Sequence, residues 1–406
     1  MNSINRINDG SSTERLQSLD VYRGLIMVAL AFNNFGLATT AGEYLKETPG
    51  SGFWQAVQYQ FSHCEWVGCS FWDMIQPSFM FMVGVSMAYS YVKRHAQGDS
   101  WSSMLGHAMV RAIVLCFLGV FLISNGKPAT NWSLMNVLTQ IGLGYTFLFL
   151  LWRKPAWFQL IVAAALLCGT WALYNYLAPS KTELAQLAGD RGVSLEWADE
   201  HLAAVGAPWH KNANIGHVID VWLLNKLPQE KPFEASSGGY QTINFIPSLA
   251  TMLFGLMCGE LLRSRRSPQA KLVWLLIAGS IGIALGLAWH WQGCPIVKRL
   301  WTPSWALFST GICCLILMIL YGVIDVAGFR TWCFPLVVVG MNSIAIYVMG
   351  MLLRGWTAGA LRTHLGPDIF LLAGDKWAPC LQATMVGCCF WLACWWMYRN
   401  KIFVRI

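Results

Sequence analysis

Ten mostly apolar stretches follow one another along the chain, and each is close to the length needed to cross a bilayer. A helix rises 1.5 Å per residue, so about 20 apolar residues span a hydrocarbon core of roughly 30 Å. The stretches are residues 21–40, 71–92, 108–124, 134–151, 157–177, 244–262, 272–290, 304–324, 333–353 and 380–398. This pattern predicts an all-α, polytopic membrane protein with about ten transmembrane helices, arranged as a first half (21–177) and a second half (244–398).

The distribution of Lys and Arg predicts the orientation of these helices. An even number of spans puts both ends of the chain on one side, and basic residues are enriched in cytoplasmic loops. The strongest basic cluster is Arg263, Arg265 and Arg266. Placing this cluster inside makes both termini cytoplasmic, as an N-terminal segment 1–20 and a tail 399–406. The polar first twenty residues predict no removable signal peptide.

Two segments on the predicted non-cytoplasmic side are too long to be simple turns, residues 41–70 and 178–243. Loops of this length are usually functional or disordered. The second segment has helical periodicity at Leu184, Leu187, Leu195, Trp197 and Leu202. We therefore predict a small non-cytoplasmic cap over 178–243 and a catalytic loop over 41–70.

Composition supports a membrane location and argues against nucleic acid as a partner. Hydrophobic residues make up 56% of the 406 positions and charged residues 12%, whereas a soluble domain has about 25% charged residues. The net charge is +8, but the Lys and Arg residues are scattered between the apolar stretches. The expected surroundings are therefore the lipid bilayer, and no basic stripe indicates DNA or RNA binding.

The cysteines and the metal-ligating residue types give weaker signals. Cys64, Cys69, Cys294 and Cys380 lie near predicted non-cytoplasmic ends and allow at most one or two disulfides, with no pairing determined. No zinc signature or Cys-x-x-Cys pair is present, so we expect no metal site.

His63 and Asp73 are the first candidates for chemistry. An imidazole in an outer loop titrates near neutrality and can act as a base or nucleophile, although an interfacial His among aromatic residues is the common alternative. Asp73 opens the second apolar stretch, where an acidic residue is costly and therefore a candidate site residue. The alternative for Asp73 is capping of the helix N-terminus, where a carboxylate meets free amides.

Polar residues also interrupt the first and ninth apolar stretches. Asn34 lies near the outer end of the first stretch and could donate to an oxyanion or orient a substrate amine, while interhelical hydrogen bonding is the commoner role. At the inner end, Asp20 and Arg23 have the i, i+3 spacing of an intrahelical ion pair. Asn342 and Ser343 in the ninth stretch present the same alternatives as Asn34.

Four motifs occur in order along the chain: the Arg15–Gly24 run around Asp20, the stretch from His63 through Asp73 and Pro77 to Gly84, Lys298-Arg299-Leu300-Trp301-Thr302-Pro303-Ser304, and Gly340 to Val348 around Asn342. Together these motifs resemble those of the heparan-alpha-glucosaminide N-acetyltransferase family. The resemblance covers nearly the whole chain.

This resemblance implies an enzyme that takes an acetyl group from cytosolic acetyl-CoA and delivers it to an amino sugar on the far side of the membrane. The family's essential loop histidine falls on His63, and its asparagine before an aromatic residue and glycine falls on Asn34, with Asp73 as a third catalytic candidate. Since the sequence begins at the first shared helix, without the luminal domain of the animal enzymes, we expect a bacterial member in the inner membrane. A homodimer is one open alternative for the oligomeric state.

The donor and the reaction route follow from the same resemblance. Coenzyme A is anionic, so its nucleotide should stay near the cytoplasmic helix ends, where Arg23, Asp20, Asn342 and Ser343 are candidate cofactor-binding residues and Arg111 is a further phosphate partner. The acceptor, the choice between N- and O-acetylation, and the choice between an acetyl-His63 intermediate and direct transfer stay open.

A transporter for amino sugars is the main alternative. In that case His63, Asp73 and Asn34 would bind sugar and couple protons without acyl transfer. Transporters often contain internal repeats and broken helices. No clear repeat relates the two halves of the sequence, which favours the enzyme.

Overall fold

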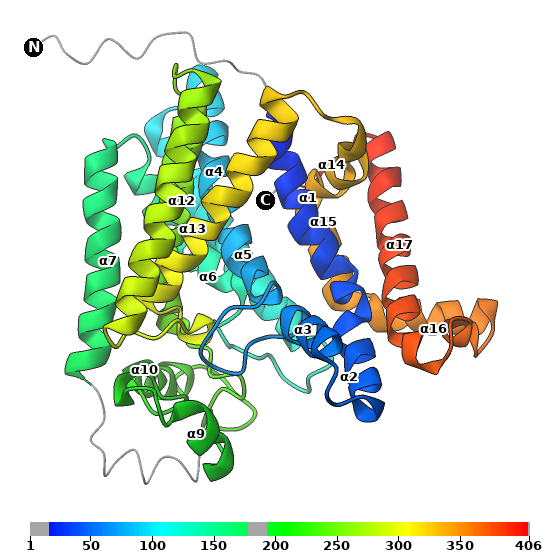
Figure 1. Cartoon of the computed structure of the whole chain (residues 1–406). Coiled ribbons are helices and arrows are strands. Elements are labelled where there is room, and N and C mark those ends of the chain that lie inside the picture. Colours follow the sequence, from blue (N-terminus) through cyan, green and yellow to red (C-terminus); the bar gives the residue numbers. More distant parts are fainter. Residues whose placement is uncertain (1–15, 178–192, 405–406) are drawn as a thin grey trace, which may run out of the picture.

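The computed structural model describes residues 16–177 and 193–404, and within these ranges the chain is helical and contains no β-strand (Figure 1). The prediction of an all-α membrane protein is confirmed at this level. Residues 1–15 of the predicted N-terminal segment and residues 405–406 of the predicted tail lie outside the described residues.

The first half contains long helices and a pair of short helices after the first apolar stretch. In chain order the elements are α1 (Gln17–Ala31), the 3-10 turn η1 (Asn33–Gly36), α2 (Leu37–Glu47), α3 (Gly52–Phe61), η2 (Trp72–Met74), α4 (Ile75–Ala96), α5 (Trp101–Ser124), α6 (Val137–Leu151) and α7 (Ala156–Tyr176).

The cap and the second half follow. The elements are α9 (Leu195–Leu202), η3 (Ala207–Trp209), α10 (Ile215–Leu224), η4 (Thr242–Asn244), α11 (Phe245–Arg263), α12 (Pro268–Trp291), η5 (Lys298–Leu300), α13 (Pro303–Leu320), η6 (Tyr321–Val326), η7 (Thr331–Cys333), α14 (Phe334–Gly340), α15 (Ser343–Leu352), α16 (Arg354–Leu365), η8 (Ile369–Leu371), η9 (Asp375–Trp377) and α17 (Ala378–Arg399).

Each of the ten predicted stretches is largely helical, but fewer helices qualify as membrane spans. Among the described residues, six helices are long and apolar enough to cross a bilayer, and up to eight if each of two bent pairs counts as one span. The helix α6 has only 15 residues. The chain is thus a multi-pass membrane protein, and ten spans remains a prediction.

The predicted outer segments gather at one end of the molecule. Figure 1 shows α2, α3, α9, α10 and α16 at this end, while α1 begins and α17 ends at the opposite end. This arrangement agrees with the topology predicted from the basic residues. The assignment of one end to the cytoplasm remains a prediction.

The cap rests on the loop that contains His63. The predicted helix around Trp197 is present as α9, whereas Leu184 and Leu187 lie outside the described residues. Trp66 donates its indole N–H to the carbonyl of Trp209 at 2.9 Å, and Trp209 stacks on Tyr174 at 5.1 Å between ring centroids. These buried aromatic contacts join the cap to both the loop and the outer end of α7.

The first predicted helix is broken where the sequence pattern indicates a single span. Asn33, Asn34, Phe35 and Gly36 all have positive φ angles, between 47° and 67°, and α1 and α2 are bent by 45° across this turn. Non-glycine residues rarely adopt this conformation, so the break is held against local preference by the surrounding structure. A second broken pair, bent by 65°, joins the η7–α14 segment to α15.

Close helix contacts bring α1 against α14. A Cβ atom at Gly24 would lie 2.0 Å from the carbonyl oxygen of Leu336, and one at Gly340 would lie 2.0 Å from the carbonyl oxygen of Asp20. Only glycine permits backbones to approach this closely in a membrane bundle. The contact places Asp20 beside the segment that contains Asn342.

Candidate active site

Three charged or titratable side chains, His63, Asp73 and Lys298, meet at the end of the bundle that is predicted to be non-cytoplasmic. His63 Nδ1 lies 2.7 Å from Asp73 Oδ1, and Lys298 Nζ lies 3.2 Å from the same oxygen. Lys298 Nζ is also 3.1 Å from His63 Nδ1. The side chains of Asp73 and Lys298 are 2% and 7% exposed, whereas that of His63 is 40% exposed. The cluster therefore has a buried ion pair beneath an accessible ring.

The second carboxylate oxygen of Asp73 organises the loop that leads to it. The backbone N–H groups of Cys64 and Ser70 donate to Asp73 Oδ2 at 3.0 and 3.2 Å, and the Ser70 hydroxyl lies 2.9 Å from the same atom. The Asp73 N–H in turn donates to the Ser70 hydroxyl oxygen at 3.3 Å, so Ser70 and Asp73 form the reciprocal pair of a capping box at the start of η2. Capping is therefore one role of Asp73, and the same carboxylate also contacts His63 and Lys298.

Lys298 is a member of the site to which the sequence reasoning assigned no role. It lies in the Lys298–Ser304 segment, where Trp301 has a φ of 48°. The Thr302 hydroxyl donates to the carbonyl of Pro295 at 2.7 Å and accepts a hydrogen bond from the N–H of Val297 at 3.1 Å. These two hydrogen bonds of Thr302 fix the turn that contains Lys298. The motif itself was the available signal, since it begins with a lysine in the short loop between the apolar stretches 272–290 and 304–324.

The neighbouring Arg299 ties the same turn to the cap and the loop. Its guanidinium donates to the carbonyls of Gly238 at 2.9 Å and Cys64 at 3.4 Å. Asn244, which directly precedes α11, donates to the carbonyl of Arg299 at 2.8 Å. The backbone around Lys298 is thus held from several sides.

Asn34 lies close to the same loop. Its side-chain Nδ2 donates to the carbonyl of Phe61 at 2.9 Å, two residues before His63. The side chain is buried, and its Oδ1 has no hydrogen-bond partner within the described parts of the chain. An unpaired buried amide oxygen is costly, so this atom is available to accept from a bound N–H or O–H group.

The electrostatics around His63 favour its neutral form. Partial burial lowers the pKa of the imidazole; the hydrogen bond to Asp73 opposes this shift, and the cations of Lys298 and Arg299 add to it. The nearby thiol of Cys64 is a poor nucleophile, because burial raises its pKa to about 11. His63 is therefore the group in this loop best able to act as a base or nucleophile near neutral pH.

The cysteines show no cross-link in the described parts of the chain. Cys64, Cys69, Cys294 and Cys380 are all free thiols, so none of the disulfides left open by the sequence is formed. The same parts of the chain contain no group of three or more His, Cys, Asp or Glu side chains placed to hold a metal.

The predicted cofactor-binding residues lie together at the opposite end. Asp20 pairs with Arg23 at 3.4 Å, as the spacing predicted. Asp20 lines a cavity of about 640 Å³ together with Gln17, Val337, Met341, Tyr398, Arg399, Lys401 and Phe403. Asn342 donates to the carbonyl of Ile402 at 3.2 Å and accepts from the N–H of Val404 at 3.2 Å. Asn342 thus holds the C-terminal segment that supplies two cavity residues.

Ser343 and Arg111 have local partners. The Ser343 hydroxyl, at the start of α15, donates to the carbonyl of Gly340 at the end of α14, at 2.8 Å. The Arg111 guanidinium lies 4.7 Å from the centre of the Tyr145 ring. Neither residue lines the cavity at the Asp20 end.

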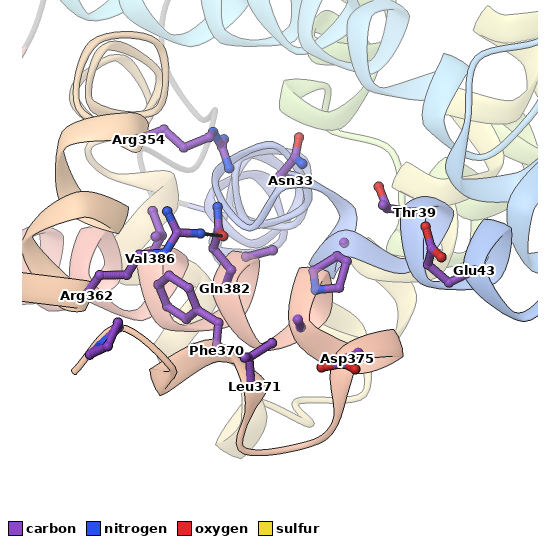
Figure 2. Close-up of a pocket in the computed structure, with 15 residues that line it drawn as sticks. Asn33, Thr39, Glu43, Arg354, Arg362, Phe370, Leu371, Asp375, Gln382 and Val386 are labelled. Atoms are coloured by element: carbon purple, nitrogen blue, oxygen red, sulfur yellow. Dashed lines mark hydrogen bonds between the residues drawn. The ribbon is translucent and has the colours of Figure 1, made fainter. Parts of the chain in front are cut away.

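A second cavity, of about 560 Å³, lies between α2, α16 and α17. Figure 2 shows Arg354 and Arg362 at one end of this cavity, with Glu43 and Asp375 toward the other. Asn33 faces the cavity, whereas His63, Asp73 and Lys298 are not among its lining residues. We therefore assign the chemistry to the His63 cluster, which has the reactive groups, and not to this cavity.

Comparison with known proteins agrees with the motif-based resemblance. The chain is 23% identical over 436 aligned positions to the heparan-alpha-glucosaminide N-acetyltransferase of Mus musculus, which covers 98% of this chain and 61% of that protein. The Homo sapiens protein of the same name is 23% identical over 428 positions, covering 97% of this chain and 60% of its own length. No family model matches the chain. The chain spans about three fifths of the length of these relatives, and it is similar to them along nearly all of its own length.

Proposed function

We propose that this chain is a membrane acetyltransferase that moves an acetyl group from acetyl-CoA at its cytoplasmic end to a glucosamine-type sugar at the opposite end. The observation that carries this proposal is the His63–Asp73–Lys298 cluster, because it combines an accessible imidazole with a buried carboxylate that orients it. The relatives' name supports the reaction class. The proposed location is the bacterial inner membrane.

His63 is the proposed base or nucleophile. In direct transfer, its free ring nitrogen removes a proton from the acceptor amine as that amine attacks the thioester carbonyl, and coenzyme A leaves as the thiolate. In the covalent route, the same nitrogen attacks the carbonyl, coenzyme A leaves, and the acceptor then attacks acetyl-His63. Both routes require the ring to be neutral.

Asn34 is the proposed group that orients the acceptor. Because its Nδ2 already donates to Phe61, the atom left for a ligand is Oδ1, which accepts hydrogen bonds. This favours contact with a substrate amine or hydroxyl over donation to an oxyanion.

The cavity that contains Asp20 is the proposed site for the donor's nucleotide. Arg399 and Lys401 supply positive charge for phosphate groups, and Tyr398 and Phe403 supply aromatic rings for the base. Asn342 contributes by holding the C-terminal segment, not by direct contact.

The decisive experiment supplies purified protein in detergent or liposomes with acetyl-CoA labelled in the acetyl group and a panel of amino sugars. Label recovered in the sugar supports the transferase, and His63→Ala should remove it. The two broken helix pairs are a feature found in transporters. Uptake of an unmodified sugar into liposomes without label transfer would therefore replace the proposal with the transporter alternative.

A further inference from the structure

The hydrogen bond between His63 and Asp73 determines the tautomer of the ring. Asp73 Oδ1 is an acceptor, and it lies 2.7 Å from His63 Nδ1. Two unprotonated acceptors at this distance would repel, so Nδ1 carries the proton and donates it to Asp73. The ring nitrogen with the free lone pair is therefore Nε2, which has no hydrogen bond within the described parts of the chain.

The Asp73 carboxylate beside His63 would by itself work against the role of His63 as a general base. A carboxylate next to an imidazole stabilises the imidazolium, and the protonated ring can neither accept a proton nor attack an acyl group. The ammonium of Lys298 lies 3.2 Å from the same carboxylate oxygen and 3.1 Å from the ring nitrogen. It neutralises the carboxylate and repels a positive charge on the ring.

We propose that Lys298 is a positioning residue that allows Asp73 to hold the His63 ring in the Nδ1–H tautomer while keeping that ring neutral, with Nε2 directed to the reactants. The proposal rests on the proposed function and deepens it, because it specifies which groups keep the His63 ring in the neutral form that can act as a base. The groups that face the ring are Asp73, Lys298 and, more remotely, Arg299.

The location of Lys298 makes it suited to this role. Its side chain is 7% exposed, and its turn is fixed by the hydrogen bonds of Thr302 and Asn244. Arg299 is the matched control, because it follows Lys298 directly but donates hydrogen bonds to the backbone carbonyls of Gly238 and Cys64. A substitution there removes a cation without breaking the ion pair with Asp73.

The test measures the chemistry of His63 without either substrate. Diethyl pyrocarbonate reacts with neutral imidazole, so the rate of His63 modification, read by peptide mass spectrometry from about pH 5 to pH 9, reports the neutral fraction. We expect Lys298→Met and Lys298→Gln to move the inflection to higher pH and to lower the ratio of rates at pH 6 and pH 8 by roughly threefold or more. Lys298→Arg should stay near wild type, and Arg299→Met should change the ratio less than Lys298→Met.

Coincident inflections for wild type, Lys298→Met and Lys298→Gln would overturn the proposal. If neither Lys298→Met nor Lys298→Gln accumulates in the membrane, the pH profile of His63 modification in the wild-type protein tests the proposal. An inflection above the ordinary histidine range would contradict a ring that is kept neutral. The exposed His364 is the internal reference, because its modification rate reports the activity of the reagent and should be the same in every folded variant. The modification assay needs no acetyl-CoA, so it tests the role of Lys298 independently of acetyl transfer. A failure of label transfer would overturn the proposed function and leave the result of the modification assay unchanged.

Discussion

Lys298 and Asp73 are 225 positions apart in the chain, and their side chains form a buried ion pair with 3.2 Å between Nζ and Oδ1. Removing one member leaves the other charge buried and unpaired, which typically costs about 3–5 kcal/mol. We therefore expect Asp73→Asn to lower activity and also to lower thermal stability. The double variant Asp73→Asn/Lys298→Met should be more stable than Asp73→Asn alone. Thermal unfolding of the purified proteins measures both effects, and additive losses would show that the two charges are not coupled.

His63→Ala should abolish acetyl transfer while leaving acetyl-CoA binding largely intact, because the proposed nucleotide cavity is at the opposite end of the bundle. General acid–base catalysis is typically worth about 10²–10⁴-fold. Label transfer and equilibrium binding of acetyl-CoA measure the two properties, and His364→Ala on the exposed face of α16 is the matched control. A loss of less than about tenfold would remove His63 from both catalytic roles.

Activity should rise with pH as His63 loses its proton. The pKa of the ring is lowered, mainly by partial burial, so the rise should be centred below the usual histidine range. Below the inflection the ring is charged and inactive; above it the ring is neutral. An amine acceptor also titrates, so a hydroxyl acceptor is the cleaner substrate for the profile of kcat/KM. A profile that falls as pH rises through this range contradicts the base role.

Loss of positive charge from the cavity at the Asp20 end should weaken donor binding. We expect Arg399→Met and Lys401→Met to raise the KM for acetyl-CoA, with little change in the diethyl pyrocarbonate reaction of His63. Lys154→Met is the control, because Lys154 is exposed and does not line the cavity. An unchanged KM in both cavity variants would place the nucleotide elsewhere.

The predicted topology can be tested by labelling single cysteines in a background without reactive thiols. Gln58 and Arg265 are exposed, and they lie in the predicted outer and inner segments. An impermeant maleimide applied to intact cells should label Gln58→Cys, whereas Arg265→Cys should react only after permeabilisation. The reverse pattern would invert the orientation and place His63 in the cytoplasm.

Local sequence was sufficient to predict much of this architecture. Hydrophobic stretches of the right length predict helices because an apolar segment in a bilayer must satisfy its backbone hydrogen bonds internally. His63, Asp73 and Asn34 could be selected because polar residues beside such stretches are costly, and the chain does place them around one loop. The helical periodicity around Trp197 also predicted α9 correctly.

Other features depend on contacts between distant segments and were decided only by tertiary structure. Local preference opposes the left-handed turn at Asn33–Gly36, so packing must hold it, and a Cβ at Gly36 would lie 2.4 Å from the carbonyl oxygen of Pro379. The capping of a helix start by Asp73 could be proposed from the sequence, but its contacts with His63 and Lys298 could not, because they form only when distant segments pack together. A sequence gives the charge of Lys298 but not its distance from Asp73, because ion pairing across 225 residues follows from how the helices pack and not from any local pattern.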